Sequence, residues 1–109
     1  MCKNGNWIKI ADYREEIDFN DHHIACKQIN GRSVCIINTK NGLKAFSSKC
    51  PHAGGDLSSG FLDIRGNIIC PVHHYRFNLI NGMDTNREGY FLKIFQTKEN
   101  EDGIFIELA

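Results

Sequence analysis

Two short segments that each combine a cysteine with a histidine constrain this chain more than any other feature. The first is Cys-Pro-His at residues 50–52, and the second is Cys-Pro-Val-His at residues 70–73, with seventeen residues between them. Both prolines of the chain directly follow these cysteines, and proline fixes the backbone φ angle. A thiolate and an imidazole in each of two stiffened loops are typical of a metal site built from both loops.

The length and charge of the chain limit what it can be. At 109 residues it fits one domain, 1–109, and 41% apolar residues are enough for a buried core. Thirteen basic and thirteen acidic side chains cancel, so nothing draws the chain to nucleic acid or to an anionic membrane. No apolar run approaches the roughly 18–20 residues of a membrane span. We therefore expect neither nucleic acid nor a membrane as a partner.

The five cysteines indicate a reducing compartment. If Cys50 and Cys70 are metal ligands, Cys2, Cys26 and Cys35 remain, unlike the paired cysteines of a small secreted scaffold. The N-terminus also lacks the apolar stretch of a secretory signal. Both features favour a cytoplasmic protein.

Short segments of alternating apolar pattern, separated by Asn-Gly and similar turns, predict an all-β fold. We expect an antiparallel sandwich or barrel, with a small subdomain in which loops at about 49–57 and 70–77 meet. The expected strands are 7–11, 23–29, 32–37, 43–46, 64–69 with a bend at 66–67, 75–77, 90–96 and 104–108. A helical turn is expected only within 56–62, a turn and a short extended piece within 12–19, and a solvated polar loop at 84–88.

The dipeptide Asn30-Gly31 favours a type I′ hairpin, because both of its positions accept a positive φ angle. A two-residue turn there places Cys26 opposite Cys35 at a non-hydrogen-bonded pair, the closer kind. The pair could form a strained disulfide or remain as two reduced thiols in or near the core. We favour the reduced pair, because a free cysteine packs as a small hydrophobe and the compartment looks reducing.

Two thiolates and two imidazoles can hold a single tetrahedral zinc ion. Zinc sites, however, usually take Cys-x₂₋₄-Cys or His-x₃₋₅-His pairs from each loop. Here each loop mixes one cysteine with one histidine, and the Cys-x-His spacing at 50–52 is very tight. This arrangement favours a larger centre of two irons and two sulfides, whose ends are each held from both loops.

The residues of both loops resemble those of the Rieske [2Fe–2S] proteins. The matching stretches are Cys-Pro-His-Ala-Gly-Gly-Asp-Leu at 50–57, Cys-Pro-Val-His at 70–73 and Arg-Phe at 76–77. They are most similar to the soluble Rieske ferredoxins that supply electrons to ring-hydroxylating oxygenases. The all-β pattern of the remaining chain agrees with the fold of that family.

The resemblance implies one Rieske-type [2Fe–2S] cluster per chain. Cys50 and Cys70 would bind one iron, and His52 and His73 the other. Neutral imidazoles leave such a cluster less negative than four thiolates do, which raises its reduction potential.

Within the Rieske range, the resemblance implies a low reduction potential. Rieske proteins of cytochrome bc complexes join their loops by a disulfide, but the matching positions here are Gly55 and Val72. Those proteins also place serine and tyrosine hydroxyls against the cluster sulfurs, where this chain has Tyr75 and Phe77. Phenylalanine cannot donate a hydrogen bond and tyrosine is a much longer donor than serine, so the reduced cluster is less stabilised. We expect a midpoint of about −150 to 0 mV.

The glycines and a second histidine of the loops have expected roles as well. Gly54 and Gly55 lack side chains, which would let backbone N–H groups approach a sulfide. His74 stands where the ferredoxins usually have glycine, and it could alter the surface near the cluster. The Cys-x-x-His spacing favours His73 over His74 as the ligand.

These features predict an electron carrier without catalytic residues of its own. As the resemblance implies, the chain would pass one electron at a time from a reductase to a terminal oxygenase or other oxidoreductase, with His52 and His73 as the exit edge. It would be a monomer that docks transiently on both partners. One alternative is a small Rieske-type subunit of a larger enzyme, such as a nitrite-reductase-like assembly. Another is a structural Cys₂His₂ zinc domain.

Overall fold

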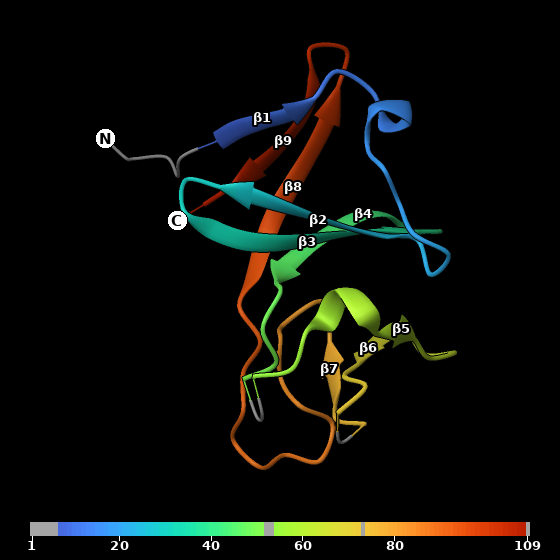
Figure 1. The fold of residues 1–109 in the computed structure, drawn as a ribbon, viewed down its shortest axis with the longest axis vertical. Helices are drawn as coiled ribbons and strands as arrows, with labels where there is room; N and C mark the ends of the chain where they lie inside the picture. The colour runs from blue at the N-terminus through green and yellow to red at the C-terminus, as the bar shows by residue number, and fades with distance from the viewer. Residues whose placement is uncertain (1–6, 52–53, 73, 109) are drawn as a thin grey trace.

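The computed structural model describes residues 7–51, 54–72 and 74–108, which form two antiparallel sheets stacked along the long axis (Figure 1). The larger sheet has six strands in the order β1-β9-β8-β4-β3-β2, and the smaller has three in the order β5-β6-β7. The strands are β1 (Trp7–Ala11), β2 (Ile24–Ile29), β3 (Arg32–Thr39), β4 (Gly42–Ser47), β5 (Phe61–Leu62), β6 (Asn67–Ile69), β7 (Arg76–Asn78), β8 (Ile94–Asn100) and β9 (Gly103–Glu107). Two 3₁₀ turns, η1 (Arg14–Glu16) and η2 (Leu57–Ser59), complete the elements, so the expected all-β fold is confirmed.

The first expected hairpin is confirmed in its turn and in its register. Asn30 and Gly31 have φ angles of +51° and +81°, as a type I′ turn requires. Strands β2 and β3 pair so that Cys26 lies opposite Cys35. The neighbouring strand β4 pairs with β3 on its other side, which leaves β2 at the edge of the sheet.

Two expected strands are wrong in their extent. The segment 64–69 is strand only from Asn67, because the Asp63 carboxylate accepts hydrogen bonds from the N–H groups of Arg65 and Asn67 and thereby closes a turn. Ile64 is fully exposed in that turn. The closing strand expected at 90–96 begins only at Ile94.

The two segments expected to contain turns each contain a 3₁₀ turn. The helical turn expected within 56–62 is η2, whose first N–H groups are capped by Asp56 through a 3.0 Å hydrogen bond from the Ser58 N–H. The segment 12–19 contains η1. In the part of the chain that the structure describes, no helix has the length and apolar character to cross a bilayer.

Strand β3 is buried on both faces, and this fixes the layering of the molecule. Val34 and Ile36 enter a core enclosed by the six-stranded sheet, whereas Cys35 and Ile37, one residue out of phase, enter a second core. All four side chains are fully buried. The second core joins the sheet to the small subdomain, and its members there include Leu57, Ile68, Phe77, Leu79 and Leu92.

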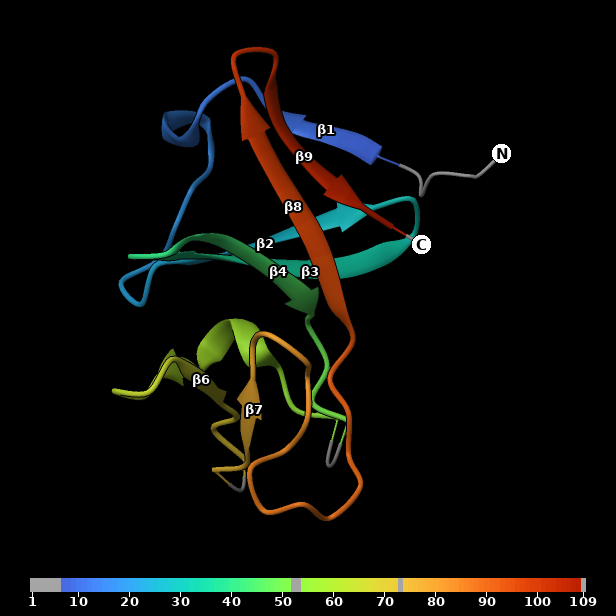
Figure 2. The ribbon, with the colours of Figure 1, turned by 180° about the vertical axis from the view of Figure 1, so that it is seen from behind.

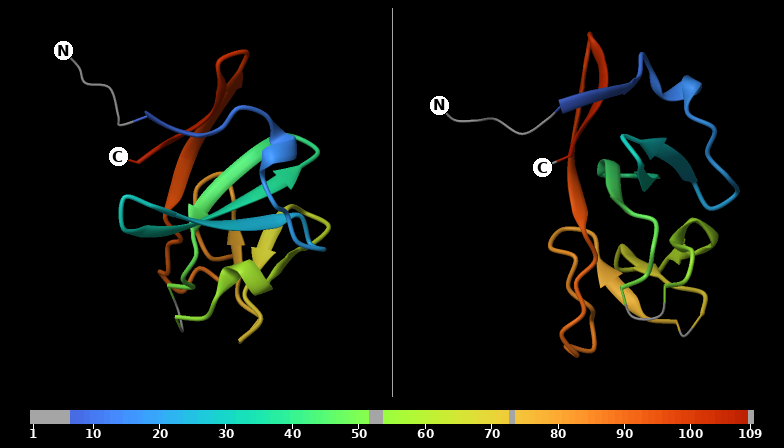
Figure 3. Two further views of the ribbon diagram at one scale, coloured as in Figure 1. Left: turned by 45° about the horizontal axis from the view of Figure 1, so that its top comes forward. Right: turned by 60° about the vertical axis from the view of Figure 1, so that its left-hand side comes forward.

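The small subdomain is inserted between two strands that pair with each other. Strand β4 ends at Ser47 and strand β8 begins at Ile94, and Ile94 lies opposite Phe46. The Ser47 N–H donates to the carbonyl oxygen of Lys93 at 2.9 Å, which ties the two chain crossings together. Seen from behind and in the turned views, the subdomain lies beyond the sheet, at the end opposite the β8–β9 turn (Figures 2 and 3).

Candidate metal centre

Each cysteine-containing loop is a short hairpin closed at its base. Lys49 and Asp56 pair across the first as an isolated antiparallel bridge, and Ile69 of β6 pairs with Arg76 of β7 across the second. Residues 50–55 form the first loop and residues 70–75 the second, so each contains six residues and starts with its cysteine.

The two loops share one pattern of backbone hydrogen bonds. The N–H groups of Cys50 and Cys70 each donate to the carbonyl of the last residue of their own loop, both at 2.8 Å. The carbonyl of each cysteine accepts from the N–H four residues on, which belongs to Gly54 in the first loop and His74 in the second, again at 2.8 Å. The N–H and the carbonyl of each cysteine are therefore both hydrogen-bonded, which fixes the position of its Cα atom and the direction of its Cα–Cβ bond.

The residue four positions after each cysteine has a left-handed backbone. The φ angle is +71° at Gly54 and +59° at His74. Glycine adopts this conformation freely, whereas it costs other residues about 1–2 kcal/mol. His74, at the position where the Rieske ferredoxins usually have glycine, therefore adopts this backbone at a conformational cost. The Gly54 N–H donates to the Cys50 carbonyl, and the approach of backbone N–H groups to a sulfide stays a prediction.

The two loops meet where Gly55 faces Val72 and Cys70. A Cβ atom on Gly55 would lie 2.5 Å from Cγ2 of Val72 and 3.1 Å from Sγ of Cys70. Non-bonded carbon atoms pack at about 3.5–4.0 Å, so only glycine fits this position without movement of its neighbours. The positions at which cytochrome bc Rieske proteins have their disulfide thus face each other here, with glycine and valine in place of cysteines.

Both expected sulfur ligands are withdrawn from solvent. Cys50 is 2% exposed and Cys70 is 1% exposed, and both belong to the second, apolar core. His52 and His73 lie outside the described residues, so the structure describes two of the four expected ligands. Within the described ranges, no three metal-ligating side chains come together.

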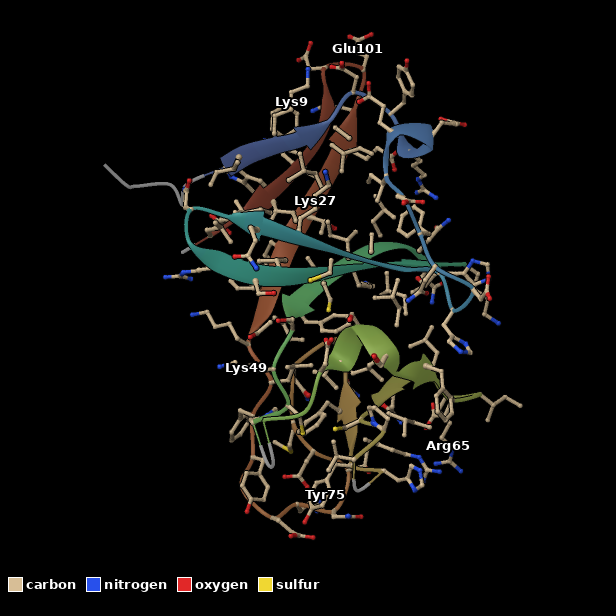
Figure 4. All side chains as sticks on the ribbon, in the orientation of Figure 1. Lys9, Lys27, Lys49, Arg65, Tyr75 and Glu101 are labelled. Carbon is tan, nitrogen blue, oxygen red and sulfur yellow. The ribbon has the colours of Figure 1, made fainter. Side chains whose placement is uncertain are left out.

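The hydroxyl of Tyr75, at the end of the second loop, is held by a carboxylate. It donates to Oε1 of Glu88 at 2.7 Å, and this hydrogen bond, followed by partial desolvation, raises the pKa of Tyr75 to about 12. The ring lies edge-on to Tyr90 at 5.8 Å between centroids. Tyr75 lies in the small subdomain at the end far from Glu101 (Figure 4). Phe77, fully buried, supplies no hydroxyl.

The segment that carries Glu88 is anchored by a buried aspartate. Asp84 is 1% exposed, and its carboxylate accepts from the N–H of Glu88 at 3.1 Å and of Tyr90 at 2.9 Å. Burial alone raises the pKa of a carboxyl, but these backbone hydrogen bonds outweigh it and hold the pKa of Asp84 below its ordinary value. The solvated loop expected at 84–88 is confirmed for the exposed residues 85–88, whereas Asp84 is buried and orders the segment. The signal in the sequence was the aspartate at the start of a polar turn, because such a carboxylate can accept hydrogen bonds from N–H groups further along the chain.

The residues present fit a [2Fe–2S] cluster. Two loops of equal length and equal hydrogen bonding each direct one cysteine into the same apolar core. A glycine keeps side-chain atoms away from the Cys70 sulfur where the loops meet. Thiolate ligands in an apolar, water-poor shell are what such clusters require.

The sequence matches the Rieske [2Fe-2S] domain family over residues 6–89. It is 32% identical over 96 residues to the oxygenase subunit of carnitine monooxygenase from Acinetobacter baumannii, covering 87% of this chain and 25% of that protein. It is also 32% identical over 79 residues to the ferredoxin component of the 2,4-dinitrotoluene dioxygenase system of a Burkholderia strain, covering 71% and 70%. The chain thus spans about a quarter of the oxygenase subunit but most of the ferredoxin component.

Solved structures share the fold. The ferredoxin of carbazole 1,9a-dioxygenase from Nocardioides aromaticivorans superposes with a TM-score of 0.78 and 18% identity, covering 94% of this chain and 98% of that one. A protein proposed to be the small subunit of an NADH-dependent nitrite reductase from Mycobacterium tuberculosis gives 0.82 and 15%, with 98% of both chains covered. At these identities the structures support the architecture alone. The family match, in contrast, covers most of the chain and both loops, so the chain belongs to the Rieske [2Fe–2S] domain family and carries its cluster type.

Proposed function

We propose that this domain is a one-electron carrier, which takes electrons from a reductase and passes them to a terminal oxygenase or another oxidoreductase. The observation that carries the proposal is the pair of equivalent loops, each presenting a buried cysteine at one end of the molecule. A ferredoxin component that is 32% identical and similar in length supports this role. The chain needs no catalytic residue for it.

In the proposed centre, Cys50 and Cys70 would bind one iron, and His52 and His73 would bind the other. The bound cluster supplies one-electron chemistry. The chain positions both cysteines by their backbone hydrogen bonds, and the second core keeps water from their sulfurs. The Cys-x-x-His spacing supports His73, and not His74, as the ligand from the second loop.

A low reduction potential, about −150 to 0 mV, follows from the groups around the loops. The Tyr75 hydroxyl donates to Glu88, and Phe77 has no hydroxyl. Neither side chain therefore offers a hydroxyl of the kind that stabilises the reduced state in the high-potential Rieske proteins. A potentiometric midpoint well above +100 mV contradicts this proposal.

A second candidate keeps the fold but makes the domain a permanent part of a larger enzyme. The likeness to a nitrite reductase small subunit over nearly the whole chain favours it. Val72, Met83 and Phe91 are exposed apolar side chains of the small subdomain, and Met83 pairs with Phe91 across an isolated bridge. Sedimentation of the purified chain alone and with candidate partners separates a monomeric carrier from a stable subunit. Monomeric state, transient docking and a cytoplasmic location stay predictions.

Electron paramagnetic resonance of the dithionite-reduced protein, with iron and sulfide counted on the same sample, tests the proposal. We expect a Rieske-type signal, with an average g value below that of all-cysteine clusters, and two irons per chain. His73→Ala should abolish that signal, whereas the matched control His74→Ala should retain it. Stoichiometric zinc without iron would remove the electron-transfer role and leave the fold unchanged.

A further inference from the structure

Two cysteines outside the metal centre lie opposite each other in the larger sheet. Cys26 of β2 pairs with Cys35 of β3, four register positions from the Asn30-Gly31 turn. Counting back from a two-residue turn makes this a non-hydrogen-bonded pair, whose Cα atoms are typically about 4.5 Å apart. Disulfides bridge Cα separations of about 4.4–6.8 Å. The backbone therefore already holds the two thiols at bridging distance, although neither is in a disulfide.

The two thiols differ in their access to solvent. Cys35 is fully buried in the second core, whereas Cys26 is exposed on the edge strand β2. The Cys26 Sγ lies 3.4 Å from Oγ of Ser33, on the same face of the sheet. An oxidant from solution can therefore reach Cys26 first, and Cys35 lies opposite it on the neighbouring strand.

A groove lined by basic side chains borders Ser33, the residue that the exposed thiol contacts. The groove has a volume of about 440 Å³, and its lining includes Arg32, Lys49 and Lys93. None of the described residues that line this groove is acidic. Cationic side chains without a carboxylate among them favour a negatively charged small molecule. The Asp56 carboxylate acts electrostatically on Cys35 and accepts hydrogen bonds from the Ser58 N–H and hydroxyl.

We propose that Cys26 and Cys35 form a thiol-oxidation site that exchanges with a small anionic disulfide of the glutathione type. The Cys26 thiolate attacks one sulfur of the disulfide, which forms a mixed disulfide and releases one glutathione thiolate. The Cys35 sulfur then attacks Cys26 and expels the second. The chain loses two hydrogens and gains one S–S bond, and one glutathione disulfide becomes two glutathione thiols.

The environment of each sulfur sets the order of these steps. Burial, and then the neighbouring Cys26, raise the pKa of the Cys35 thiol to about 12, so Cys35 is a poor first nucleophile. Once Cys26 carries the mixed disulfide, the second step is intramolecular and needs only the pairing that the strands already impose. A cross-strand disulfide of this kind is strained, so excess reduced glutathione should reverse the reaction.

The test is incubation of the cluster-loaded protein with oxidised glutathione in a Cys2→Ser background. We expect the intact mass to fall by two hydrogens, a Cys26–Cys35 cross-link in the peptide map, and unchanged visible absorbance of the cluster. Cys35→Ser should stop at a stable glutathione adduct on Cys26, and Cys26→Ser should not react. The thiol reaction does not depend on electron transfer by the cluster, so its failure leaves the proposed function untouched.

Charge neutralisation and a change of oxidant test the groove. The Arg32→Gln/Lys93→Gln variant should lose several-fold in the rate of oxidation, whereas Lys40→Gln, in the β3–β4 turn, should not. The cationic disulfide cystamine should react more slowly than oxidised glutathione, and the difference should shrink at high salt. A persistent adduct on Cys26 of the background protein, or a Cys50–Cys70 cross-link with loss of the cluster, overturns the proposal. A faster reaction with cystamine overturns the part assigned to the groove.

Discussion

Replacing Gly55 by alanine tests whether the two loops are packed against each other as the structure shows. The added Cβ would lie 2.5 Å from Cγ2 of Val72 and 3.1 Å from Sγ of Cys70. The methyl must therefore gain about 1 Å from Val72 to reach an ordinary separation of about 3.5 Å. Gly55 does not have a positive φ angle, so the cost is steric alone. Overpacking of this kind costs about 1–3 kcal/mol. At about 2 kcal/mol, a domain of this size loses about 8 °C in thermal midpoint.

A double-mutant cycle with Val72→Ala separates this clash from other effects. Val72 is half exposed, so its truncation alone should cost less than about 1 kcal/mol. In the Gly55→Ala/Val72→Ala protein the nearest clash is gone, and we expect a favourable coupling of about 1 kcal/mol or more, within the range for residues in contact. Rescue should be incomplete, because the Cys70 sulfur still lies 3.1 Å from the new methyl. The measurement is the thermal midpoint of the loaded protein, followed by visible absorbance. Effects that add within about 0.5 kcal/mol would refute the packing of the loops.

Three further substitutions test other parts of the site. His74→Gly should raise the free energy of unfolding, measured by urea denaturation, by up to about 1 kcal/mol. Glycine removes the cost of the left-handed backbone at φ +59°, and its own entropic penalty is smaller than that cost. A loss of stability contradicts this prediction. Tyr75→Phe should move the midpoint potential by less than about 20 mV, because the Tyr75 hydroxyl donates to Glu88. A fall of about 60 mV or more, which corresponds to one charge-assisted hydrogen bond, would instead mean that the hydroxyl donates to the cluster. The folded-state pKa of Asp84 lies below its ordinary value of 3.8, so its contribution to stability is complete above that pH and is lost as the pH falls through the folded pKa. Asp84→Asn should therefore lower the thermal midpoint at pH 7, and the difference from the native protein should shrink below about pH 4; a constant difference argues against this role.

Most of the sheet could be predicted because its signals are local. Asn30-Gly31 fixes a hairpin, and the alternation of β3 fixes which side chains enter which core. The errors lie where a side chain redirects the backbone. The Asp63 carboxylate turns the chain before β6, so an apolar residue, Ile64, is left in solvent. An aspartate followed by Arg65, Gly66 and Asn67 is a turn signal within the segment expected to be strand.

For the candidate site, the sequence indicated the expected ligands but not the contacts that support the two loops. The spacing of the two cysteines carries the resemblance, and the structure places both in one buried core. The contact of Gly55 with Val72 was implied by the family disulfide. The hydrogen bond between Tyr75 and Glu88 was not, because it joins residues thirteen positions apart through a segment that reads as a polar loop.

The internal hydrogen bonds of the two loops fix their shapes, but they cannot fix how the loops lie relative to each other. The relative position of the two loops must be set by the elements that follow them in the chain. The first loop runs directly into η2, whose Leu57 is fully buried, and the second runs directly into β7, whose Phe77 is fully buried. Both side chains pack in the core formed by one face of β3 and β4, where Phe46 lies. The two loops of the candidate metal centre are therefore aligned through a common apolar layer, and the larger sheet sets how Cys50 and Cys70 lie relative to each other.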